Sequence, residues 1–335
     1  MKKSRLLILI LSLFLFLTAC SSGKNSDDEI KIGILNTPND VAVARNLNYF
    51  QKEFPNQKLK FITFDSGVDA NKALMSGGVD FATMGDTNGI VALTAEIPVR
   101  LLWINEICGS NEQLIVKKKS HIESVQDLKG KKIATPFAST SHYSLMIALK
   151  KYHLENKVTI LDMDTQNIVA AWKRGNIDAA YTWQPTLTQL QSDGKTLLDS
   201  SDLANWGYST GNVTLVREQF LENRPNDVKK FVKVLSKAHD LRKSNYQLAV
   251  KAAAKQTGIS KSDADKQMEG TDWISIDQEY STDYLGDKDS VGQFVKEMQT
   301  AGEFMYGQQT ISYPPKLAEF NKFTYRFGGE KFWKR

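Results

Sequence analysis

The sequence has 335 residues, 24% of them charged, with a formal net charge of +5 and two cysteines. A chain of this length buries one or two large cores. Exported proteins that rely on disulfides usually carry cysteines in pairs, so we expect a fold held by its core, with Cys108 as a small buried apolar residue. No clustered basic face is evident, which argues against nucleic acid as a partner.

The N-terminal segment MKKSRLLILILSLFLFLTACSSGKNSDDE is expected to be a targeting segment rather than part of the fold. A basic start precedes an apolar run over 6–17 that is too short to span a membrane, which predicts a signal peptide at 1–19. The tetrapeptide LTAC resembles the bacterial lipobox, which implies cleavage before Cys20 and its acylation; an ordinary signal peptide with an incidental cysteine is the alternative. Residues 20–29 then form a flexible tether. Removing the three basic residues of 1–19 lowers the net charge from +5 to +2.

The next part of the chain alternates short β-branched or aromatic runs with helical patterns. This alternation is typical of βαβ units and a mostly parallel sheet. The expected elements are strands at 31–35, 58–64, 81–85 and 99–105, and helices at 40–54, 68–77 and 86–95.

From about Glu112 the pattern restarts, and after Val216 the chain is largely helical. We expect strands at 113–118, 131–135, 157–161, 178–183 and 212–216, and helices at 125–130, 141–152, 166–174, 225–244, 245–258 and 289–303. Pro225 suits a first helical position. The sequence therefore predicts an α/β fold with two lobes, 30–111 with 218–335 and 112–217. Each lobe is a mostly parallel sheet flanked by helices, with a helical C-terminal region.

Polar or aromatic corners follow several expected strands. In open α/β sheets, ligands bind beyond the carboxyl ends of the strands, at helix N-termini. Two facing lobes would put two such edges around one cleft, which suits a small ligand clamped by both. The corner residues are Asn36, Thr37, Asp86, Thr87, Ser139, Thr140, His142, Tyr143 and Trp183.

The corner PFASTSHYS, 136–144, carries five hydroxyl side chains and one imidazole at a predicted helix start. N-capping is the alternative role for Ser139 or Asp86, but capping takes only one side chain per helix. Hydroxyls and backbone N–H groups at a positive helix end suit an oxyanion such as a carboxylate, phosphate, sulfate or sulfonate. Because the corner has no lysine or arginine, it favours a singly charged anion over a polyphosphate.

Four segments, FDSGVDANKALMSGGVDFATMG, PFASTSHYSLMIALKKY, AAWKRGNIDAAYTWQP and DGKTLLDSSDLANWG, resemble the nitrate, sulfonate and taurine group of solute-binding proteins of bacterial ABC importers. The resemblance covers about 30–240 and is most specific to the taurine branch. It implies a type II periplasmic-binding-protein-like fold without catalysis, cofactor or metal. It also implies a monomer, lipid-anchored on the outer face of the cytoplasmic membrane, that delivers taurine or a small aliphatic sulfonate to a permease and its ATPase.

The resemblance also implies roles for individual residues. The sulfonate would be held by the hydroxyls and amides of the corner after 131–135. Trp183 would form an aromatic wall, although it could also be plain core. The residues implied are Asn36, Thr37, Ser139, Thr140, His142, Tyr143 and Trp183.

One position departs from the taurine branch. That branch has an aspartate, placed to pair with the ligand ammonium, where this chain has Asn212, which keeps hydrogen bonding but loses the charge. We hypothesise that Asp86, with Glu112 at the expected first crossover, supplies the carboxylate instead. Otherwise the ligand lacks an amine and is an alkanesulfonate.

Other functions are weighed against these residues. Binding proteins for nitrate or for a pyrimidine precursor of thiamine would use related folds, and a structural surface lipoprotein would need no cleft. His142 beside serines invites a nucleophile–base pair. However, Ser141 and His142 point different ways from a helix start, and no G-x-S-x-G, H-E-x-x-H, C-x-x-C or phosphate-loop motif is present, so we do not expect an enzyme.

Overall fold

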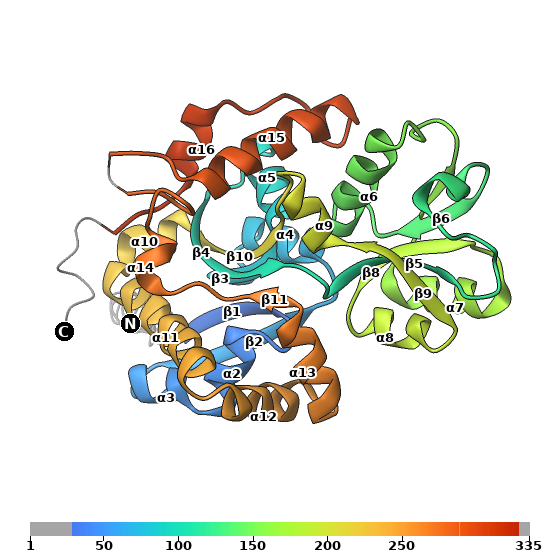
Figure 1. The fold of residues 1–335 in the computed structure, drawn as a ribbon. Helices are drawn as coiled ribbons and strands as arrows, with labels where there is room; N and C mark the ends of the chain where they lie inside the picture. Colours follow the sequence, from blue (N-terminus) through green and yellow to red (C-terminus); the bar gives the residue numbers. More distant parts are fainter. Residues whose placement is uncertain (1–28, 288, 328–335) are drawn as a thin grey trace, which may run out of the picture.

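The computed structural model describes residues 29–287 and 289–327, which form two sheets, each packed against helices (Figure 1). The predicted signal peptide, the lipidation site at Cys20 and the tether up to residue 28 lie outside these residues. The two-lobed α/β prediction is confirmed, and Cys108 is buried as expected.

The first sheet has the strand order β11-β4-β10-β3-β1-β2. β1 pairs in parallel with β2 and β3, while β10 is antiparallel to both β3 and β4. Strands β1 to β4 therefore run in the same direction, and their carboxyl ends meet at one edge. The strands are β1 Glu29–Leu35, β2 Lys58–Phe64, β3 Phe81–Gly85, β4 Val99–Cys108, β10 Gly211–Arg217 and β11 Thr271–Asp272.

Helices cover both faces of this sheet because its strands alternate apolar side chains between two cores. On one face pack α2 Asp40–Asn46, α3 Tyr49–Glu53, α10 Glu218–Asn223, α11 Pro225–Ser244, α12 Tyr246–Thr257 and α13 Lys261–Glu269. On the other pack α4 Gly67–Met75, α5 Asp86–Thr94, α15 Gln293–Gly307 and α16 Leu317–Phe323. The short helix α14 Ile276–Glu279 lies between α13 and α15 in the chain.

The helix expected at 40–54 is divided into α2 and α3. Asn48 adopts a left-handed conformation with φ of 56°, which ends one helix and begins the next at a different angle. Asparagine tolerates this conformation better than most residues do. Apolar residues recur on both sides of Asn48, so the spacing of apolar residues alone did not predict that the helix is interrupted there.

The second sheet has the order β7-β6-β8-β5-β9. β6 is parallel to β7 and β8, whereas β5 is antiparallel to β8 and β9. Its elements are β5 Glu112–Lys117, η2 Val125–Leu128, β6 Lys132–Thr135, α6 Thr140–Lys151, β7 Thr159–Asp162, α7 Thr165–Arg174, β8 Ala179–Trp183, α8 Thr186–Gln191, β9 Gly194–Asp199 and α9 Ser200–Asn205. The last three elements after β8 were not predicted.

The chain crosses between the sheets at 109–111 and again at 206–210. Because β10 pairs with β3 and β4, the expected lobe boundary at 217 is wrong, and the chain returns to the first lobe before Gly211. A strand pattern does not tell which sheet the strand joins. At the first crossover a Cβ on Gly109 would lie 2.7 Å from the carbonyl oxygen of Gly270, so glycine permits the close packing of this segment on the C-terminal region.

Candidate functional site

A cavity of about 370 Å³ opens between the two sheets. Its walls are mainly the corners that follow β1, β2, β3, β6 and β8, together with the first turn of α7. The carboxyl ends of the strands are where an α/β sheet offers a ligand site. The volume is that of a small-molecule site enclosed by both lobes.

Most of the residues expected at the site line this cavity. The first lobe contributes two of the predicted corner residues and Asn212, and the second lobe contributes the rest. The predicted residues found there are Asn36, Thr37, Glu112, Ser139, Thr140, Trp183 and Asn212. The structure therefore brings together residues that are up to 176 positions apart in the chain.

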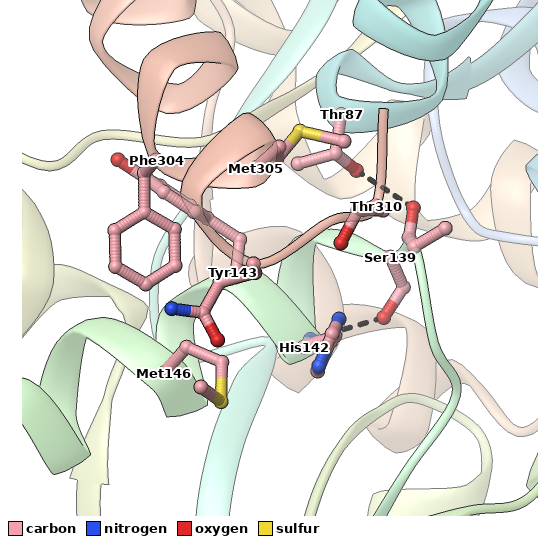
Figure 2. A pocket seen from close by; sticks show the side chains of 10 residues that line it. Thr87, Ser139, His142, Tyr143, Met146, Phe304, Met305 and Thr310 are labelled. Atoms are coloured by element: carbon pink, nitrogen blue, oxygen red, sulfur yellow. Dashed lines mark hydrogen bonds between the residues drawn. The ribbon is translucent and has the colours of Figure 1, made fainter. Parts of the chain in front are cut away.

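Thr87, His142 and Tyr143 do not line the cavity. They line a much smaller hollow, of about 10 Å³, behind the start of α6, together with Phe304 of α15 (Figure 2). The His142 ring stacks on Phe137 with a centroid distance of 4.4 Å, and burial lowers its pKa. Their placement contradicts the expectation that these three residues contact the ligand in the main cavity.

Asp86 lines neither cavity. Its Oδ1 accepts a hydrogen bond of 2.6 Å from the Thr87 N–H, and its Oδ2 accepts one of 3.1 Å from the Gly211 N–H. Burial raises the pKa of this carboxyl to about 8. Asp86 therefore joins the start of α5 to β10, and it does not line the cavity in which it was expected to supply the ligand carboxylate.

The hydroxyls of Ser139 and Thr140, the two residues of this corner that line the cavity with a hydroxyl, are already hydrogen-bonded within the protein. Ser139 Oγ accepts from the His142 N–H at 3.1 Å and donates to the Pro136 carbonyl at 2.5 Å, so Ser139 is the N-cap. Thr140 Oγ1 donates to Glu112. What α6 offers to the cavity is its first backbone N–H groups, which have no acceptor within a helix.

Glu112 lies at the cavity as predicted, but both of its oxygens have partners. Oε1 accepts from Thr140 Oγ1, and Oε2 accepts from Ser200 Oγ at 3.2 Å. Burial raises its pKa to about 7. All three residues belong to the second lobe, so Glu112 organises that wall.

Glu106 was missed by the sequence reasoning. It lies on β4 opposite Asn212 of β10, and its Oε1 accepts a hydrogen bond of 2.6 Å from Asn212 Nδ2. Burial raises the pKa of Glu106 to about 7, although the bond from Asn212 works in the opposite direction. The available signal was an acidic residue inside the largely apolar strand RLLWINEIC.

Two further corners were also missed. Phe64–Val68 follows β2, and Ser66 caps α4 by accepting a hydrogen bond of 3.3 Å from the Asp69 N–H. Thr165 and Gln166 bring the first turn of α7 to the cavity. The strand-end reasoning that found the other corners would have found both of these.

The cavity is acidic and contains no cationic side chain. Among the described residues that line it, Asp65, Glu106 and Glu112 are acidic, and none is lysine, arginine or histidine. The N-terminal turns of α4, α6 and α7 all reach it. Helix N-termini stabilise an anion, and a carboxylate stabilises a cation. The cavity walls therefore contain groups suited to a negative and to a positive part of a ligand.

The described part of the chain lacks both a metal-binding cluster and a membrane-spanning helix. Residues 29–287 and 289–327 contain no group of three or more histidine, cysteine or acidic side chains placed to hold a metal ion. Over the same ranges, no helix combines the length and the apolar character needed to cross a membrane.

Comparison with known proteins gives matches over much of the chain. The family described as NMT1/THI5 like matches residues 39–246. A taurine-binding periplasmic protein of Escherichia coli is 40% identical over 192 residues, which span 57% of this chain and 59% of that protein. A putative aliphatic sulfonates-binding protein of Bacillus subtilis is 28% identical over 247 residues, 70% of this chain and 73% of that protein.

Among solved structures, the periplasmic aliphatic sulphonate binding protein SsuA of Escherichia coli superposes with a TM-score of 0.73 at 21% sequence identity. The alignment covers 90% of this chain and 94% of that chain. This likeness shows the periplasmic-binding-protein fold, which by itself hosts many functions. The sequence relatives are binding proteins rather than enzymes. With more than half of its length matched, the chain belongs to the NMT1/THI5-like family.

Proposed function

We propose that this protein is the solute-binding component of an ABC importer and captures taurine or a related small aliphatic sulfonate between its lobes. The observation that carries this proposal is the interlobe cavity, where three helix N-termini converge without a cationic side chain. Such a site binds one compact anionic head group through backbone dipoles. The names of the relatives, which include taurine-binding and sulfonate-binding proteins, support the same ligand class.

Closure of the two lobes is the proposed mechanism of capture. Walls from both sheets contact the ligand, so a bound ligand favours the closed arrangement by its differential affinity for that state. The closed protein then docks on a membrane permease, and an ATPase partner powers import. A lipid on Cys20 would hold the binder near that permease; stable attachment takes more than one acyl chain.

A ligand screen tests the function. The purified mature domain is heated with taurine, small alkanesulfonates, sulfate, nitrate or hydroxymethylpyrimidine, and the melting temperature is recorded. A ligand at 100 times its dissociation constant stabilises by about 2.7 kcal/mol, which is an easily measured shift. We expect shifts with taurine or small sulfonates only. A shift with nitrate or the pyrimidine alone, or with none of the compounds, would refute the proposal.

The lipid anchor has a separate test. Mass spectrometry of the full chain expressed in bacteria should show a mature N-terminus at an acylated Cys20. The Cys20→Ser variant should leave the membrane fraction while keeping ligand binding. Recovery of an unmodified Cys20 in the soluble fraction would favour the ordinary signal peptide.

A further inference from the structure

Three buried carboxyl groups lie at or beside the cavity, and their hydrogen bonding differs. Asp86 and Glu112 each have a protein donor on both oxygens. Glu106 accepts one hydrogen bond, from Asn212 to Oε1, and its other oxygen has no partner among the described residues. Of the three, Glu106 therefore both lines the cavity and keeps an open acceptor.

Given the sulfonate-binding function proposed above, on which this assignment rests, we propose that Glu106 is the ammonium-binding residue of the cavity. The ligand class is then a short zwitterionic aminosulfonate, with its anionic end at the helix N-termini and its amine at Glu106. Asn212 acts as a positioning residue, because its side-chain amide donates to Glu106 and orients the carboxylate.

No protein cation neutralises Glu106. The charged groups that act on its pKa are Asp40 of α2 and Glu112 of β5, which raise it, and Arg242 of α11, which lowers it. The Arg242 Nη2 donates to the carbonyl oxygens of Met268 and Thr271, both at 2.6 Å, rather than to Glu106. An unpaired buried carboxylate is costly, so a positive group supplied by the ligand gains the full benefit of the pairing.

The strand pairing explains how this chain dispenses with an acidic residue at position 212. Asn212 and Glu106 are register partners on β10 and β4. The Glu106 carboxylate on the neighbouring strand therefore lies beside the Asn212 side chain. The charge is present in the wall, but it comes from a strand interior rather than from a strand-end corner.

The test compares taurine with propane-1-sulfonate, which replaces the ammonium with a methyl group of similar size. Titration calorimetry on the wild type should show taurine binding the more tightly. The Glu106→Gln variant should lose about 30-fold or more in taurine affinity, the expected effect of removing one member of a buried charge pair. Its affinity for propane-1-sulfonate should be unchanged or higher, which also verifies that the variant is folded.

Two further variants are matched to this one. Glu222→Gln makes the same change at an exposed residue of α10 that does not line the cavity, and it should leave taurine affinity unchanged. Adding Asn212→Asp to Glu106→Gln returns a carboxylate to the pair and should restore taurine affinity to within about tenfold of the wild type. A taurine affinity that Glu106→Gln leaves unchanged overturns the assignment.

One measurement needs no substitution. Near pH 7, taurine should displace about half a proton per molecule bound, measured by calorimetry in buffers of different ionisation enthalpy, because a carboxyl with a pKa near 7 is half protonated there. Propane-1-sulfonate should displace none. If neither compound binds the wild type, the proposed function itself fails. If both bind equally and Glu106→Gln leaves their ratio unchanged, the sulfonate function stands and the role of Glu106 is refuted.

Discussion

The two lobes present different walls to the same cavity. In the second lobe the cavity-lining Ser139, Thr140 and Glu112 are hydrogen-bonded within the protein: Ser139 caps α6, and Thr140 and Ser200 both donate to Glu112. The buried hydroxyls of this lobe that lack a partner, such as that of Thr182, do not line the cavity. In the first lobe polar atoms remain open. Glu106 has one oxygen without a partner, and the buried Thr37 Oγ1 has none among the described residues.

This difference separates two tasks. A wall whose side chains are already hydrogen-bonded is rigid. We propose that it offers its backbone N–H groups and Trp183 to any ligand of the right size. A wall with unpaired acceptors and donors discriminates between ligands. A ligand that leaves a buried polar group without a hydrogen-bond partner loses more binding free energy than the contact alone contributes. We therefore expect substitutions in the second lobe to weaken all ligands alike, and those in the first lobe to change which ligand is preferred.

The largest effect outside Glu106 is expected at Trp183. Trp183→Ala removes a large half-buried aromatic surface from the second-lobe wall and should weaken taurine and propane-1-sulfonate by about 100-fold each, as for a central aromatic contact. Calorimetry with both ligands measures the two losses. Trp206→Ala removes a tryptophan that does not line the cavity and should leave affinity unchanged. Unequal losses of affinity for the two ligands would contradict the proposal that the second-lobe wall binds all ligands alike.

The pH dependence of binding should differ between ligands. The proposed pairing needs ionised Glu106, and burial raises the pKa of that carboxyl to about 7. Taurine affinity should therefore rise about tenfold from pH 6 to pH 8. Asp40, Glu112 and Arg242 are the other charged groups acting on Glu106. Propane-1-sulfonate has no ammonium, so its affinity should not rise over this interval. Parallel pH profiles for the two ligands would contradict the pairing.

A smaller effect is expected at Thr37. Thr37→Val keeps the shape of the side chain but removes a hydroxyl without a partner, so the ligand-free protein should be at least as stable while taurine binds about fivefold more weakly. Thr182 also has a buried hydroxyl without a partner, but it does not line the cavity, and Thr182→Val should leave affinity unchanged. Denaturant unfolding and calorimetry measure the two quantities. Equal affinities for Thr37→Val and the wild type would remove Thr37 from the site.

The smallest effect is expected away from both walls. Phe304 of α15 packs edge-on against Tyr143 of α6, with ring centroids 5.5 Å apart, and so joins the first lobe to the second. Phe304→Ala should weaken every ligand by about threefold, because it removes an aromatic contact between the lobes without touching the cavity. Tyr306→Ala, on the same helix but exposed, is the matched control. A ligand-dependent effect would contradict this role.

The strand-end rule predicted much of the cavity lining from the sequence, because a corner such as Ser139–Thr140 is defined by its neighbours in the chain. It failed where the outcome depends on distant partners. Asp86 follows a strand as predicted, yet its carboxylate turns to the N–H groups of Thr87 and Gly211. Glu106 meets Asn212 only through the pairing of β4 with β10, which local patterns do not predict. Because of the same pairing, β10 belongs to the first lobe and not to the second lobe, where the sequence analysis placed it.

Contacts that α15 and α5 of the first lobe make with the second lobe have a consequence for ligand affinity. The Ala138 carbonyl accepts hydrogen bonds from Thr87 Oγ1 and Asn88 Nδ2, at 3.1 and 3.0 Å, on the same side of the molecule as the Phe304 contact. In the proposed mechanism of closure, parting the lobes would strain or break these links before the ligand is released. On that mechanism, residues that do not contact the ligand would help to determine how long it stays bound, and substitutions in the C-terminal helices would change affinity without changing which ligand is preferred.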